Sequence, residues 1–195
     1  MSIPILSEQV QTDQEIVSIG LDLSMTDTGI AGVMSDGAIL TDHITSKGRK
    51  DATVSERRER LKLIVDGIQS HPLVRAGAGR CEITIEGPSY GSTGGAAHER
   101  AGLWWLTVDV LLAALFRVHV VAPSTLKKYA TGKGNASKDE VIAGVVRRYP
   151  QADVTNNNVA DAVVLAAIGA RHACHPVDEL TVQRADAFAK VRWAA

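Results

Sequence analysis

The sequence contains few of the features that mark secreted or membrane proteins. Only two cysteines occur in 195 residues, Cys81 and Cys174, and neither belongs to a metal-binding or redox motif. We therefore expect reduced thiols in a cytoplasmic protein. No apolar run is longer than the one at residues 110–116, well short of the roughly 20 residues of a membrane span. Residues 1–14 lack the basic start and apolar core of a signal peptide, so we expect neither secretion nor a membrane partner.

The chain also has little net charge, and it has no internal repeats or low-complexity segments. Its formal charge is −1, which gives no overall sign of a nucleic-acid partner. Two local runs are nevertheless basic, because residues 46–62 carry seven Lys or Arg and residues 126–138 carry four Lys and no acid. Since no linker interrupts the chain, we expect a flexible N-terminus at 1–15, one folded domain at 16–175 and a poorly patterned C-terminal tail at 176–195.

Hydrophobic patterning predicts an α/β fold. Residues 16–22, 30–34 and 38–45 are apolar or alternating runs between turn signals, which predicts an antiparallel meander of three strands. Strands and helices alternate beyond it, as in a sheet that continues with parallel strands. The sequence therefore predicts a mixed five-stranded sheet flanked by helices. The further elements are a helix at 53–70, a strand at 82–87, a helix at 96–116, a strand at 118–123, and helices at 137–149 and 158–173.

Three carboxylates stand at the ends of these elements. Asp22 ends the first strand, Glu86 ends the fourth, and Asp161 falls in the first turn of the last helix, after three asparagines. Ligands of open α/β sheets gather at the carboxyl ends of the strands. Carboxylates brought together there repel one another, and a divalent cation removes that conflict. Magnesium prefers oxygen ligands, and two such ions about 4 Å apart can direct phosphodiester hydrolysis.

Four segments of the chain resemble, in order, the landmark segments of the RuvC-like Holliday junction resolvases. They are "SIGLDLSMTDTGIAGV", "ITIEGP", "VVAPSTLKKYATGKGNASKDEV" and "NNNVADAVVLAAIGARH", and the resemblance covers roughly residues 16–172. The resemblance implies an RNase H-like fold and a homodimer that cuts four-way DNA junctions symmetrically. It also implies two Mg²⁺ ions per active site, with Mn²⁺ as a substitute, and ligatable 5′-phosphate and 3′-hydroxyl ends. The compact size suits a phage-encoded member acting in the host cytoplasm.

The resemblance also assigns roles to individual residues. Asp22, Glu86 and Asp161 match the catalytic, metal-binding acids of the family. The family's fourth ligand, acidic or histidine, falls on Asn158, which can offer a metal only a carbonyl oxygen. Lysine near the scissile phosphate stabilises developing negative charge. Lys138 matches such a catalytic position, and either Lys127 or Lys128 matches another. The residues expected to contact DNA are Lys127, Lys128, Lys133, Lys138 and Tyr90, the last as an aromatic ring that stacks on junction bases.

Other interpretations predict different activities. An ATPase of the actin or sugar-kinase type needs two phosphate-binding lobes, and this chain has room for one. An RNase of the same fold would share the metal and phosphate chemistry and stays open, as does a non-catalytic junction-binding module that lost its chemistry at Asn158. No zinc site is predicted at His172, Cys174 and His175, because no fourth ligand has a suitable spacing. No motif identifies a helicase partner.

Overall fold

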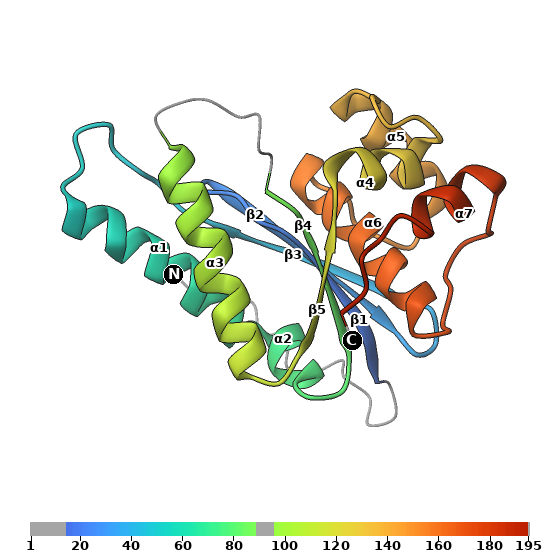
Figure 1. The fold of residues 1–195 in the computed structure, drawn as a ribbon, viewed down its shortest axis with the longest axis horizontal. Helices are drawn as coiled ribbons and strands as arrows, with labels where there is room; N and C mark the ends of the chain where they lie inside the picture. The colour runs from blue at the N-terminus through green and yellow to red at the C-terminus, as the bar shows by residue number, and fades with distance from the viewer. Residues whose placement is uncertain (1–14, 89–95, 195) are drawn as a thin grey trace.

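The computed structural model describes residues 15–88 and 96–194, which form one five-stranded sheet with helices on both faces (Figure 1). The strands are β1 (Ile16–Asp22), β2 (Asp27–Met34), β3 (Ile39–Thr45), β4 (Glu82–Glu86) and β5 (Arg117–Val121). Their order in the sheet is β3-β2-β1-β4-β5. The first three strands pair antiparallel, whereas β4 pairs parallel with both β1 and β5. The predicted mixed sheet, with a meander at one edge, is confirmed.

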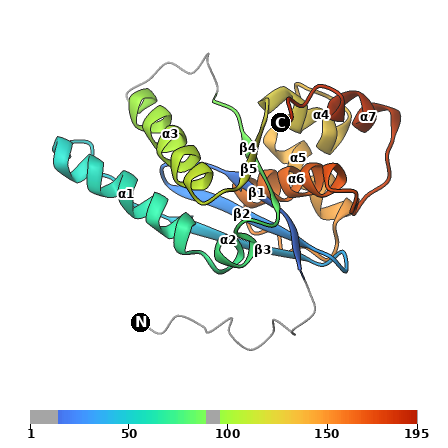
Figure 2. The ribbon, with the colours of Figure 1, turned by 60° about the horizontal axis from the view of Figure 1, so that its bottom comes forward.

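Seven helices of the described chain divide into two layers, one on each face of the sheet (Figures 1 and 2). Each layer has its own apolar core, because β1 and β4 bury residues on both of their faces. Among the described residues, none of these helices is both long and apolar enough to cross a membrane. One layer contains α1 (Val54–Ser70), α2 (Pro72–Gly77) and α3 (Ala97–Ala113), and the other contains α4 (Pro123–Thr131), α5 (Lys138–Arg148), α6 (Asn157–His172) and α7 (Val182–Phe188).

Alternation along β1 decides which side chains face α6. Ile19 and Leu21 belong to the core shared with α1, α2 and α3. Successive side chains of a strand point to opposite faces, so Gly20 and Asp22 face the layer that contains α6. Asp22 therefore emerges beneath α6 at the carboxyl end of the strand.

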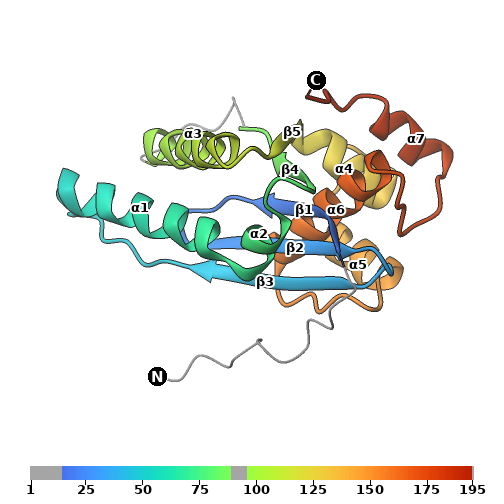
Figure 3. The same ribbon diagram turned by 90° about the horizontal axis from the view of Figure 1, so that it is seen from below.

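Two glycines of the sheet allow α6 to lie directly on it. A Cβ atom at Gly20 would lie 2.0 Å from the carbonyl oxygen of Ala162, and one at Gly29 would lie 2.1 Å from that of Asn158. Real Cβ atoms never come so close to backbone atoms, so only glycine permits this approach. The first turns of α6 are thereby held against β1 and β2 (Figure 3).

The structure contains three short helices that the sequence pattern does not predict: α2, α4 and α7. They have six to nine residues, too few to repeat an apolar face over several turns. α2 and α4 begin with Pro72 and Pro123, which are suited to a first helical position but also common in turns. The predicted capping box of Ser137 and Glu140 at the start of α5 is confirmed.

The C-terminal residues pack against the sheet and the α4 layer. Ala187 of α7 and Val191 are buried in the core shared with α4. Farther on, Arg192 forms a bridge with Val120 of β5, and the ring of Trp193 stacks on His172 with centroids 3.9 Å apart. The last twenty residues thus contain a helix and ordered contacts, although their pattern predicts no element.

Candidate metal centre

Asp22 and Glu86 are neighbours because their strands are neighbours. Leu21 of β1 pairs with Ile85 of β4 in a parallel register, and the two acids are the next residues along. Adjacent strands lie about 4.8 Å apart, so both carboxylates leave the sheet at the same edge. Asp22 is buried, with 7% of its surface exposed, and Glu86 is half-buried. The predicted convergence of these two acids is present in the fold.

α6 supplies the third carboxylate. Its N-cap is Asn156, whose side chain accepts a hydrogen bond of 2.9 Å from the backbone N–H of Val159. Because the helix begins at residue 157, Asp161 is its fifth residue and lies at the start of its second turn, so the prediction of the first turn is wrong by one residue. The close contact of Gly20 with Ala162 fixes this turn over β1, beside Asp22.

The electrostatics of the three acids show that they act on one another. Burial raises the pKa of Asp22 well above its ordinary value, and the charges of Glu86 and Asp161 raise it further. The pKa of Glu86 is raised to about 7, first by burial and then by Asp161. Burial likewise raises the pKa of Asp161 to about 6. This all-oxygen set, in an environment that disfavours negative charge, fits a hard divalent cation such as Mg²⁺.

Lysines on two helices lower these raised pKa values. Lys138, the first residue of α5, lowers the pKa of all three acids, and Lys127 of α4 lowers those of Glu86 and Asp161. Lys128 instead forms an ion pair with Asp186 of α7. Of the two lysines that the sequence left as alternatives, Lys127 is the one that faces the acids.

Asn158 lies beside the acids, and its amide is engaged with protein groups. Its Nδ2 donates to the backbone carbonyl of Asp27, and its Oδ1 accepts a hydrogen bond of 2.5 Å from Asn157. Sequence reasoning missed Asp27, a fourth carboxylate whose charge also raises the pKa of Asp22. Asp27 lies 2.9 Å from Nδ1 of His43 and accepts a hydrogen bond of 3.0 Å from Asn156. Only strand pairing, not a motif, brings it to this edge.

Trp104 of α3 holds the backbone at Glu86. Its Nε1–H donates to the carbonyl oxygen of Glu86 at 2.9 Å, and its ring packs partly buried against the α1–α3 core. The neighbouring Trp105 is 66% exposed. Tyr90, expected to stack on DNA bases, lies outside the described residues. Lys133, also expected to contact DNA, is exposed on the loop between α4 and α5.

A different group of potential metal ligands lies at the opposite end of β4. Glu82, His119 and His172 each bring one potential ligand atom within 4.8 Å of the other two. The N–H of Ala194 donates to Nδ1 of His119 at 3.0 Å, which leaves the proton of a neutral ring on Nε2, facing Glu82. Arg117 also pairs with Glu82, at 2.5 Å. This cluster could hold an ion by composition, but its hydrogen bonds anchor the C-terminal segment.

Comparison with known proteins identifies the architecture. No protein-family model matches the sequence, and no curated protein matches it. Among solved structures, Thermus thermophilus RuvC is similar with a TM-score of 0.60 and 18% identity, over 80% of this chain and 96% of that one. T. thermophilus RuvC in complex with a Holliday junction substrate gives a TM-score of 0.57 and 16% identity, over 83% and 98%. The chain therefore has the RNase H-like fold of RuvC.

Proposed function

We propose that this protein is a metal-dependent endonuclease that cuts four-way and other branched DNA. The observation that carries the proposal is the set of three carboxylates at one sheet edge, with Lys127 and Lys138 beside them. The fold supports it, because one of the similar structures is RuvC bound to a Holliday junction substrate. Recombination and repair of DNA are the processes that such an activity serves.

Each element of the site has a task in this reaction. Asp22, Glu86 and Asp161 would hold two Mg²⁺ ions, with Mn²⁺ as a substitute. When bound, such ions activate a water molecule and hold the leaving oxygen of the phosphodiester. Lys138 and Lys127 place positive charge where negative charge develops. Asn158 contributes least, because both ends of its amide already have hydrogen-bond partners.

The exposed apolar face of α3 supports a homodimer. Trp105 and Leu112 are 66% and 53% exposed, and a spacing of seven residues places them on one side of the helix. Leu63 on the neighbouring α1 is also exposed. Large apolar side chains gathered on adjacent helices are typical of an interface. A two-fold axis there would supply the two equivalent sites that symmetric cutting requires.

The proposal is tested by substrate choice. We would offer the protein a labelled four-way junction, a linear duplex of the same sequence, and a matching RNA–DNA hybrid, each with Mg²⁺, Mn²⁺ or EDTA. The expected result is paired nicks, symmetric about the junction centre, that require the metal and leave the linear duplex intact. Preferential cutting of the hybrid would make the protein an RNase. Junction binding without cutting in either metal would make it a binding module.

A further inference from the structure

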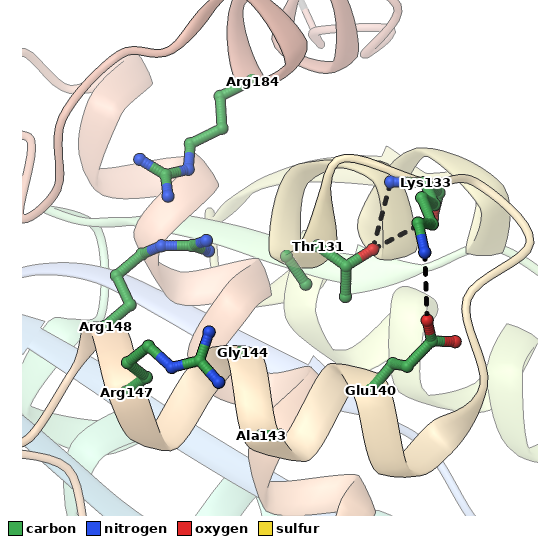
Figure 4. Close-up of a pocket in the computed structure, with 9 residues that line it drawn as sticks. Thr131, Lys133, Glu140, Ala143, Gly144, Arg147, Arg148 and Arg184 are labelled. Atoms are coloured by element: carbon green, nitrogen blue, oxygen red, sulfur yellow. Dashed lines mark hydrogen bonds and ion pairs between the residues drawn. The ribbon is translucent and has the colours of Figure 1, made fainter.

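A pocket with a volume of about 520 Å³ lies between the end of α4, one face of α5, and α7 (Figure 4). Four cationic side chains line it, Lys133, Arg147, Arg148 and Arg184, together with a single carboxylate, Glu140. Figure 4 shows the three arginines at one end of this space and Lys133 with Glu140 at the other. This concentration of positive charge stands out in a chain whose formal net charge is −1.

The one carboxylate of the pocket does not balance this charge. Glu140 lies 3.4 Å from Lys133, but its other oxygen caps α5 by accepting from the backbone N–H of Ser137. Among the described residues, Arg147 has no ion pair. Arg148 has none either: it donates to the carbonyl of Tyr129, at 3.4 Å, and its guanidinium lies 5.9 Å from the centroid of the Tyr149 ring. Three guanidinium groups around one space repel one another unless an anion binds between them.

Arg184 is a buried part of the pocket wall and is not an exposed surface side chain. It is only 9% exposed, and it donates to the carbonyl of Glu179. Its Nε has no hydrogen-bond partner in the described part of the chain and lies 3.8 Å from Asp178. Asp178 already accepts hydrogen bonds from Tyr149 and Arg171, so it neutralises Arg184 incompletely. A fixed, buried and poorly compensated guanidinium is suited to hold an anion in a defined place.

We propose that this pocket binds backbone phosphates of a DNA duplex arm, away from the cleavage centre. The proposal rests on the proposed function, which supplies DNA as the partner. Lys138, beside the catalytic acids, and Arg147, at the pocket, belong to the same helix, about 14 Å apart along its axis and on opposite sides of it. Lys133, at the other end of the pocket, lies on the loop that leads to Lys138. Duplex DNA carries one negative charge per roughly 1.7 Å of axis. We infer that an arm leaving the acids past Lys133 reaches the pocket, which then fixes the direction in which that arm leaves the junction.

Salt dependence of junction binding tests this contact. Binding would be measured in EDTA on an Asp22→Asn background, which prevents cutting, between about 50 and 200 mM salt. We compare this parent with Arg147→Gln, which removes an exposed charge that has no ion pair among described residues. Arg75→Gln is the matched control, because Arg75 is an exposed helical arginine on the opposite face of the sheet. Loss of one phosphate contact should reduce the salt slope by about 1 and weaken binding roughly three- to tenfold at low salt.

The outcomes separate this proposal from the one on which it rests. If the parent and the Arg75→Gln protein bind equally and only Arg147→Gln loses slope, the contact is established. An unchanged slope for Arg147→Gln and for Arg147→Gln/Arg148→Gln, beside a parent that binds well, overturns the pocket contact and leaves the nuclease proposal intact. Thermal stabilisation by inorganic phosphate that needs Arg147, without any effect on junction binding, would assign the pocket to free phosphate. A parent that binds no junction overturns both proposals.

Discussion

Gly20 on β1 and Ala162 on α6 are in backbone contact, because a Cβ atom at position 20 would lie 2.0 Å from the carbonyl oxygen of Ala162. This contact belongs to the same two elements that carry Asp22 and Asp161. The spacing of the candidate metal centre therefore depends on a residue that has no side chain. Neither partner is chemically reactive, so both act by setting a distance.

Substitution Gly20→Ala should separate α6 from the sheet. Overpacking of this kind costs about 1–3 kcal/mol or more, and a chain of this size loses roughly 2–4 °C in Tm per kcal/mol. Gly102→Ala is the control, because its Cβ would meet only Leu61, at an ordinary 3.6 Å. In a helix interior that change should be neutral or slightly stabilising. Thermal unfolding checks both, and equal effects would show that the close contact is unimportant.

The metal-free protein should lose stability as pH rises through the window in which the acids ionise. The pKa of Glu86 is raised from 4.5 to about 7 and that of Asp161 from 3.8 to about 6. The folded state therefore binds more protons than the unfolded state between about pH 4 and 7, so stability falls with rising pH there. Glu86→Gln should raise Tm relative to wild type by a few degrees more at pH 8 than at pH 5. Parallel pH profiles of Tm in EDTA would contradict the raised pKa.

Asn158→Asp should strengthen metal binding and weaken the metal-free fold. The new carboxylate adds an oxygen ligand with charge but also repels Asp22 and Asp27. We expect roughly tenfold tighter Mg²⁺ binding by calorimetry, with a Tm lower by a few degrees in EDTA. Asn157→Asp places the same charge one residue earlier and serves as the control. Equal metal affinities for the two variants would indicate that residue 158 does not face the ion.

Lys127→Gln should impair cutting far more than Lys128→Gln. Of these two lysines, Lys127 acts on Glu86 and Asp161, whereas Lys128 is paired with Asp186. Loss of one group that stabilises transition-state charge costs about 10²–10³ in rate. Single-turnover cleavage of a junction at saturating protein would measure the difference. Similar rate losses for these adjacent lysines would refute the assignment of Lys127 to the site.

Trp105→Glu should convert the proposed dimer to monomer. A charge in the apolar face of α3 would have to be buried without a partner. Leu180→Glu is the control, because Leu180 is 55% exposed in a loop outside the α1–α3 layer. Analytical ultracentrifugation should show a loss of dimer for the first variant alone. A wild-type protein that is already monomeric at micromolar concentration would remove the basis for symmetric cutting by one assembly.

Local patterns in the sequence predict most of the elements but few of the distances. The meander, both parallel strands and the long helices follow from periodicity and turn residues, and Ser137 with Glu140 marks the start of α5. Short helices such as α7 are not predicted, because seven residues are too few to show a helical periodicity. The acids Asp22 and Glu86 are predictable because each interrupts an apolar strand at its end. Asp27 is not, because only its pairing within the meander brings it beside Asp22.

Interactions between distant residues account for the remaining differences. Lys127 and Lys128 are indistinguishable in sequence, and the position of Asp186 separates their roles. The arginines of the pocket between α4, α5 and α7 come from two helices. Taken one at a time in the sequence, each indicates only a solvated surface charge. Likewise, Glu82 and His119 meet because β4 and β5 are parallel neighbours. Such groupings depend on tertiary packing, which no single segment encodes.

The most direct test of the central claim compares wild type with Asp22→Asn on a synthetic four-way junction in Mg²⁺. Asp22→Asn keeps the size of the buried side chain and removes the charge that would hold the metal. We predict metal-dependent paired nicks by the wild type, no cutting by the variant, and junction binding by both. Cutting by Asp22→Asn at the wild-type rate would contradict the assignment of this edge of the sheet as the catalytic metal centre.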